Sequence, residues 1–230
     1  MINKSLIKTP YGIRSVIGVG DEATVYQYHT GPYKGLVGRV QERNAVGFWD
    51  CPVFPKNVLY RFRSHQIAYT AFPQYNIDVV ALDFYGKQMF SRPVKRSRTN
   101  KKDATIEGKR ERKREYQASK TAVELPLLAK EAADTMQKSG IYVNPNIANV
   151  SVTRDEIKFF EVSHIRKELL PARVDPNLIA AQDLELKLES EELQRFLADE
   201  RFRAELLKSR GLEYLADCYS KELGSVIILR

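Results

Sequence analysis

The chain has little cysteine and no long apolar run. Its 230 residues include only two cysteines, Cys51 and Cys218, too few for a disulfide framework or a cysteine-based zinc site. No apolar stretch approaches the length of about 18 residues that indicates a membrane-spanning helix. The first ten residues lack the apolar core of a secretory signal. We therefore expect a reducing compartment, the cytoplasm, and no membrane partner.

Positive charge is abundant but unevenly spread. Hydrophobic residues make up 43% of the chain, which is ordinary for a globular protein, and the formal net charge is +8. Residues 1–115 hold 21 Lys and Arg against 10 Asp and Glu, whereas residues 116–230 hold 16 against 19. Residues 92–115 alone hold 11 basic and 4 acidic residues. The charge is therefore a local feature of one tract.

The basic tract predicts contact with polyanions, nucleic acid among them. A solvated linker or an exposed helix start is the alternative interpretation. Aromatic residues are nearly absent from the tract, so base stacking has little support. The candidate polyanion contacts are Lys95, Arg96, Arg98, Lys101, Lys102, Arg110, Arg112, Lys113 and Arg114.

Strand patterns dominate the first part of the chain. Alternating β-favouring residues, separated by glycine-rich turns, predict an antiparallel meander followed by a hairpin. One helical pattern interrupts them and is stopped by Pro73. The predicted strands cover residues 13–18, 23–28, 36–41, 77–85 and 88–91, and the predicted helix covers residues 57–72.

The second part of the chain is mainly helical. Apolar residues at three- and four-residue spacing predict a helix over residues 125–136, with Gly140 as its C-terminal cap. A polar loop is expected over residues 141–149, then a hairpin over residues 150–162. The Leu- and Glu-rich residues 175–223 predict two to four amphipathic helices with a break near Gly211. Strands first and helices last favour an α+β protein.

Two groups of residues can carry chemistry. The first lies between the first two strands and contains Gly18 and Gly20, which let a backbone fold closely over a phosphate. A plain β-turn would look the same. The second contains Asn144 and Asn149, followed by Glu161, whose side-chain oxygens can share a divalent cation. On its own, the Asn-Pro-Asn sequence in this second group is ordinary turn chemistry.

In order and spacing, these groups together resemble the protein-kinase-like superfamily. The resemblance covers roughly residues 12–165, and the alanine at Ala23 is similar to the glycine-rich loop of RIO-type atypical kinases. It implies ATP and Mg²⁺ as cofactors. The positions it implies are Gly18, Gly20, Ala23 and Val25 in the nucleotide loop, Arg39 for the nucleotide-binding lysine, Asn144 for the catalytic base, and Asn149 and Glu161 for metal.

The resemblance to protein kinases also implies a fold with two lobes. We expect a β-rich lobe with one helix and an antiparallel five-stranded sheet, a basic hinge, and a shortened helical lobe with a catalytic-loop-like hairpin. These parts correspond to residues 1–91, 92–120 and 121–230.

Departures from the kinase pattern predict weak or absent phosphotransfer. The amide of Asn144 cannot take the proton that a carboxylate takes. Glu161 adds a methylene group at a metal position, and Arg39 replaces the point charge of lysine by a planar fork. The glutamate that should pair with the lysine has no clear counterpart; Gln66 is nearest by spacing, with His65 beside it.

Three functions remain open from the sequence. The leading hypothesis is a pseudokinase that acts as a binding or regulatory scaffold for another protein and retains a nucleotide site. A divergent active phosphotransferase is the first alternative. A nucleic-acid-binding protein that uses residues 92–114 is the second, and it requires binding that weakens steeply with salt.

Overall fold

The fold mixes one antiparallel sheet with helices, so the predicted α+β class is confirmed. The computed structural model describes residues 6–19, 23–41, 55–83, 87–94, 121–145, 149–152, 156–222 and 226–227. The expectation of a five-stranded sheet is wrong, because β1 and β11 add a strand at each edge: six antiparallel strands lie in the order β1-β2-β3-β4-β6-β5, and β11 adds a short parallel strand beside β5. These strands are β1 (Leu6–Thr9), β2 (Gly12–Val19), β3 (Ala23–Tyr28), β4 (Val37–Gln41), β5 (Val79–Asp83), β6 (Gln88–Ser91) and β11 (Val226–Ile227).

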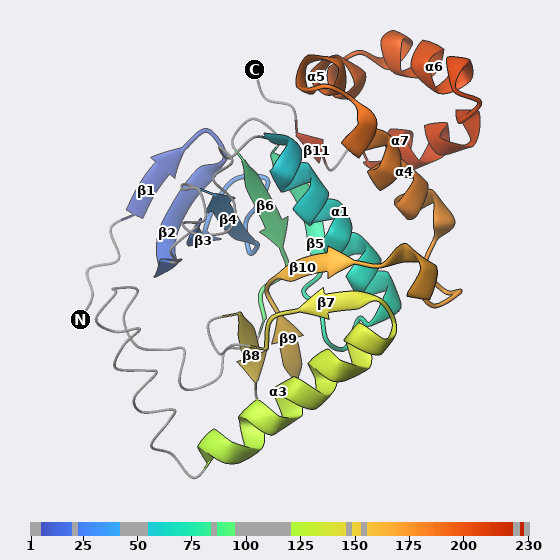
Figure 1. The fold of residues 1–230 in the computed structure, drawn as a ribbon. Helices are drawn as coiled ribbons and strands as arrows, with labels where there is room; N and C mark the ends of the chain where they lie inside the picture. Colours follow the sequence, from blue (N-terminus) through green and yellow to red (C-terminus); the bar gives the residue numbers. More distant parts are fainter. Residues whose placement is uncertain are drawn as a thin grey trace.

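Helix α1 (Pro55–Ala71) connects β4 to β5 and is the central element of the packing (Figure 1). Its first half shares a core with the sheet and the C-terminal helices, through residues such as Phe62, Leu82 and Phe196. Its second half shares another core with α3 (Thr121–Lys138) and the small strands beyond it. Helix α1 therefore contributes buried residues to both cores.

Two small ladders follow α3. Strands β8 (Val150–Val152) and β9 (Ile157–Phe159) form the hairpin that the sequence predicted. Strand β7 (Ile141–Val143) pairs with β10 (Val162–Ile165), so the expectation of a loop over residues 141–149 is wrong at its start. Gly140 adopts a left-handed φ of 77°, as its predicted role after α3 requires.

The last part of the chain is helical, as predicted. It comprises a 3-10 helix (Lys167–Leu169), α4 (Pro176–Lys187), α5 (Ser190–Ala198), α6 (Glu200–Ser209), a second 3-10 helix (Glu213–Leu215) and α7 (Ala216–Glu222). Helices α4 to α7 lie on the side of α1 away from β1 to β3, and α3 lies near the C-terminal end of α1 (Figure 1).

Gly38 lies where β4 has no room for a side chain. A Cβ atom there would come within 2.8 Å of Tyr28 Cε2 and would overlap the side chain of Gln88. Both neighbours are buried, and the Gln88 amide donates to the Tyr28 hydroxyl at 2.8 Å. The bonded pair cannot move aside without losing this contact.

Gly38→Ala is therefore expected to lower the free energy of unfolding by about 1–3 kcal/mol through overpacking, as measured by urea denaturation. Gly18→Ala is the matched control, because a Cβ at Gly18 would meet only Val25, at an ordinary 3.6 Å. Equal losses in the two variants would contradict the steric explanation.

Candidate functional site

The glycine-rich segment spans β2 and β3. Gly18 pairs with Val25, and Val25 pairs in turn with Arg39 on β4. Ala23, the first residue of β3, is buried. Gly20 lies outside the described residues. Packing around Gly18 leaves room for a side chain, so its steric surroundings do not explain why glycine stands there.

Arg39 reaches from the sheet to the segment that follows β9. Its Nη1 donates to the carbonyl oxygen of Phe160 at 2.8 Å. The residue after Phe160 is Glu161, a metal position implied by the kinase-like resemblance. The structure thus places the expected nucleotide-binding residue beside an expected metal-binding residue that is more than a hundred residues further along the chain.

The backbone of Asn149 also contacts Phe160. The Phe160 amide donates to the carbonyl oxygen of Asn149 at 2.8 Å. Glu161 is half-buried, and its carboxylate makes no hydrogen bond or ion pair with another described residue. Arg39, Asn149 and Glu161 therefore all lie next to Phe160, Arg39 and Asn149 through hydrogen bonds and Glu161 along the chain.

Asn144 lies at the end of β7. Because Val143 pairs with Val162 in the antiparallel ladder, the next residues outward, Asn144 and Glu161, are neighbours across the end of the ladder. Asn144 is exposed. The position implied for the catalytic base is therefore open to solvent and close to the position implied for metal.

His65 is the residue of α1 that belongs to this group, and the sequence analysis named it only as the neighbour of Gln66. It is 2% exposed, and burial lowers its pKa to about 3, with the charges of Arg39 and Arg61 acting in the same direction. A backbone hydrogen bond with Phe160 partly opposes that shift. His65 is therefore neutral at pH 7. We call Arg39, His65, Asn149, Phe160 and Glu161 the Arg39 cluster.

Gln66, the nearest residue by spacing to the missing glutamate, has a different partner. Its side-chain oxygen accepts a hydrogen bond from Nη1 of Arg63 at 2.9 Å. Gln66 also lines a separate cavity. The α1 residue beside Arg39 is thus an uncharged imidazole, where a kinase has a glutamate.

The Arg39 cluster has donors of the kind that Mg²⁺ accepts. Glu161 offers a carboxylate and Asn149 a side-chain amide, both hard oxygen ligands. Among the described residues, no group of three or more His, Cys, Asp or Glu side chains is arranged to hold a metal ion. Any Mg²⁺ bound here would therefore take its remaining ligands from water and from phosphate oxygens.

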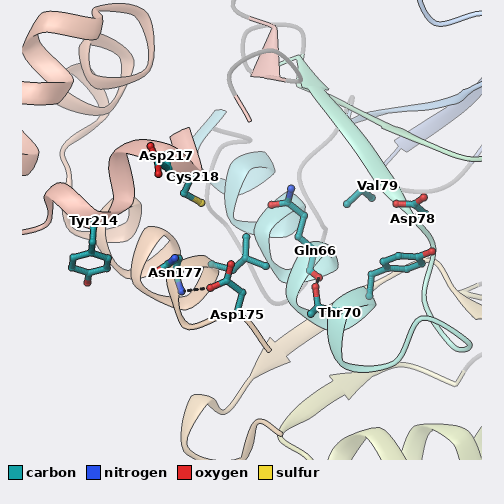
Figure 2. Close-up of a pocket in the computed structure, with 11 residues that line it drawn as sticks. Gln66, Thr70, Asp78, Val79, Asp175, Asn177, Tyr214, Asp217 and Cys218 are labelled. Atoms are coloured by element: carbon teal, nitrogen blue, oxygen red, sulfur yellow. Dashed lines mark hydrogen bonds between the residues drawn. The ribbon is translucent and has the colours of Figure 1, made fainter. Parts of the chain in front are cut away.

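A cavity of about 670 Å³ lies apart from the Arg39 cluster, between α1, the start of β5, the beginning of α4 and α7 (Figure 2). Aspartates in its lining make structural contacts. Asp175 accepts from the amide of Asn177 at 2.8 Å and caps α4, while Asp78 pairs with Arg92 at 2.9 Å. The lining residues are Gln66, Tyr69, Thr70, Asp78, Val79, Asp175, Asn177, Leu178, Tyr214, Asp217 and Cys218.

The predicted polyanion contacts, from Lys95 to Arg114, all lie outside the described residues. Arg92, at the beginning of the basic tract, is described, and its pairing with Asp78 anchors the end of β6 to the start of β5. The nucleic-acid hypothesis therefore stays a prediction from the sequence.

No helix in the described part of the chain is long and apolar enough to cross a membrane. Comparison of the sequence with models of known protein families and with curated proteins finds no match to either.

Proposed function

We propose that the chain adopts a two-lobed, protein-kinase-like fold and is a pseudokinase, a binding or regulatory scaffold that retains a nucleotide site at the Arg39 cluster. The hydrogen bond from Arg39 to the Phe160 carbonyl is the observation that carries the proposal. In protein kinases the lysine of the third strand, the helix that follows it and the metal-binding residues must meet in one place. Contacts among β4, α1 and the segments at Asn149 and Phe160 support the proposal.

The order of elements also supports a kinase-like arrangement. Helix α1 lies between β4 and β5, as a helix does between the third and fourth strands in the resemblance. The hairpin of β8 and β9 separates Asn149 from Glu161 and returns the chain to Arg39. In this reading β2 to β6 form the first lobe, and α3 with β7 to β10 forms the second.

The chemistry of the cluster favours binding over phosphotransfer. The Asn144 amide has no basic oxygen to accept a proton from a hydroxyl substrate. His65 is neutral and buried, so it does not supply the carboxylate that orients the lysine in an active kinase. Arg39 keeps its positive charge and its capacity to bind phosphate oxygens with two parallel N–H groups.

Titration with ATP and Mg²⁺, followed by calorimetry, tests the nucleotide site. The unaltered protein is expected to bind ATP, and Arg39→Met is expected to weaken binding about 10- to 100-fold, the range for a charge-assisted contact of about 1.5–3 kcal/mol. Lys34→Met is the matched control, because Lys34 is an exposed cation in the turn before β4. Absence of ATP binding at millimolar concentration would contradict the proposal.

Release of phosphate from ATP separates the pseudokinase from a divergent active phosphotransferase. The alternative is favoured by one observation, the carboxylate of Glu161 that has no partner among the described residues. The proposal predicts that turnover in the unaltered protein equals that of Glu161→Ala. Turnover that depends on Glu161 would make the chain an enzyme and would replace the scaffold proposal.

A further inference from the structure

The face of the sheet opposite the Arg39 cluster carries a separate core of aromatic residues. Arg39 and Val40 are consecutive residues of β4, so their side chains lie on opposite faces of the sheet. Arg39 reaches the Phe160 carbonyl on one face. Val40 packs on the other face, against a cluster that includes Tyr28 and Phe90. No described residue of α1 belongs to this aromatic cluster, so its face is distinct from the one that holds the proposed nucleotide site.

Two tyrosines of this face are held in place and stay partly accessible. The ring of Tyr33 stacks on Phe90, with 4.0 Å between the ring centroids and an angle of 20° between the planes. Tyr11 meets Tyr33 edge-on at 5.9 Å, and its hydroxyl donates to the buried carboxylate of Asp83. Tyr11 and Tyr33 are both half-buried. Tyrosines are enriched in protein–protein interfaces, because a partner covers a large ring at the cost of little side-chain freedom.

Arg14 of β2 extends the aromatic surface. It is the cross-strand neighbour of Tyr28, and such neighbours share a face of the sheet. Its Nη1 donates to the Tyr28 hydroxyl at 3.0 Å, and its Cζ lies 3.6 Å from the centroid of the Tyr26 ring. The Tyr28 ring lies in turn 6.3 Å from that of Tyr33. A hydrogen bond and a cation–π contact therefore hold the guanidinium next to the accessible tyrosines.

The Arg14 guanidinium has no counter-charge. It makes no ion pair with any residue that the structure describes, and its buried Nε has no hydrogen-bond partner there. Buried polar atoms are nearly always paired in folded proteins, and an exception points to a missing ligand or water. Because Nη1 is used by Tyr28, the edge formed by Nε and Nη2 remains. Such an edge holds a carboxylate through two parallel N–H groups.

We propose that Arg14, Tyr11 and Tyr33 form a docking surface for an acidic segment of a partner protein. A carboxylate of that segment pairs with the open edge of the Arg14 guanidinium, and its apolar groups pack on the two tyrosines. Charge complementarity favours an acidic partner, because Arg14 lacks a counter-charge and the chain carries a net charge of +8. The inference rests on the scaffold part of the proposed function, whose partner it specifies, and does not require the nucleotide site.

Fluorescence anisotropy with labelled synthetic peptides tests this inference. The unaltered protein is expected to bind a peptide of six glutamates and not the matching peptide of six glutamines. Arg14→Gln is expected to weaken binding of the glutamate peptide about tenfold, through the loss of a charge-assisted contact. Arg14→Lys is expected to lose less, because an ammonium keeps the charge but lacks the planar fork. Arg201→Gln is the matched control, since Arg201 is an exposed arginine on α6 that pairs with Glu205, and it should leave the affinity unchanged.

Several results would overturn the docking surface. Equal losses in Arg14→Gln and Arg201→Gln would mean general attraction to a basic protein, and absence of glutamate-peptide binding at millimolar concentration would leave no acidic partner. A labelled oligouridylate that binds more tightly than the glutamate peptide, and does so through Arg14, would replace the protein partner by nucleic acid. If urea denaturation shows that Arg14→Gln does not fold, Arg14→Lys decides, and an unchanged affinity in that variant would contradict the two-bond contact.

The docking surface and the nucleotide site fail separately. Arg14→Gln is expected to bind ATP as the unaltered protein does, and Arg39→Met is expected to bind the glutamate peptide with full affinity. Peptide binding that depends on Arg14, without any ATP binding, would support the docking surface and overturn the nucleotide site. ATP binding that depends on Arg39, without any peptide binding, would overturn the docking surface alone.

Discussion

Replacing Glu185 by alanine is expected to lower the free energy of unfolding by about 3–5 kcal/mol. Glu185 lies on α4 and forms a buried ion pair with Arg63 of α1, with 2.8 Å between Nη2 and Oε1 and side chains that are 4% and 1% exposed. The arginine Nε donates to the same carboxylate at 3.0 Å. Removing the carboxylate would leave a guanidinium buried without its counter-charge, and the cost of that desolvated charge sets the size of the loss.

Tyr219 connects α7 to the same pair. Its hydroxyl donates to Oε1 of Glu185 at 3.1 Å, and its ring packs edge-on against Phe196, with 4.9 Å between the ring centroids. Burial, reinforced by the charge of Glu185, raises the pKa of Tyr219, so the hydroxyl stays protonated and remains a donor. Glu185 thus holds both α7 and α1 to α4, and its removal is expected to loosen the C-terminal helices as a group.

Urea denaturation of three variants measures the effect. The double variant Arg63→Met with Glu185→Met removes both charges and is expected to recover most of the stability, because buried apolar pairs replace buried ion pairs at little cost. Glu205→Ala breaks an exposed pair with Arg201 and is expected to cost less than about 0.5 kcal/mol. A loss in Glu185→Ala as small as that in Glu205→Ala would contradict the buried network.

Lowering the pH from 7 to 5 is expected to cost about 2 kcal/mol of stability through His65 alone. The folded protein holds the pKa of His65 at about 3, against an ordinary value of 6.5. Between these values the unfolded chain binds a proton that the folded protein does not bind, so stability falls as the pH falls. The contribution is fully present above pH 6.5 and is lost progressively toward pH 3.

The pH dependence of the unfolding free energy in His65→Gln isolates this effect. Glutamine does not titrate, so the variant is expected to show a slope between pH 7 and 5 that is smaller by up to about 1.4 kcal/mol per pH unit. His164→Gln is the control, because His164 is exposed on β10. If His65→Gln and the unaltered protein show the same slope, His65 is accessible to protons in the folded state and its placement beside Arg39 is wrong.

The helices and strands that carry a clear periodic pattern of apolar residues were predicted from the sequence. The strand alternation of β2 to β6, the apolar spacing of α1 and α3, and the helices after residue 175 all appear where the sequence indicated. Strands β7 and β10 escaped prediction because each is three or four residues long and exists through its partner across about twenty residues. The same is true of β11, whose two residues pair with β5 from the far end of the chain.

The sequence named residues of the Arg39 cluster only where a motif marks them. Arg39, Asn149 and Glu161 followed from the kinase-like order of segments, and in the structure all three lie next to Phe160. His65 was named only as the neighbour of Gln66, because no charge or spacing distinguishes a buried histidine from a surface one. The sequence also did not predict that α4 packs on α1. The two helices are joined by Arg63 and Glu185, and arginine and glutamate are rarely buried.

A crystal structure determined with ATP and Mg²⁺ tests the proposed nucleotide site most directly. We expect the triphosphate to lie between β2 and β3 on one side and Glu161 on the other, with the guanidinium of Arg39 on phosphate oxygens and Mg²⁺ on Asn149 and Glu161. A structure in which nucleotide occupies another surface, or in which Arg39 keeps its bond to the Phe160 carbonyl with no nucleotide beside it at saturating ATP, would contradict the kinase-like account.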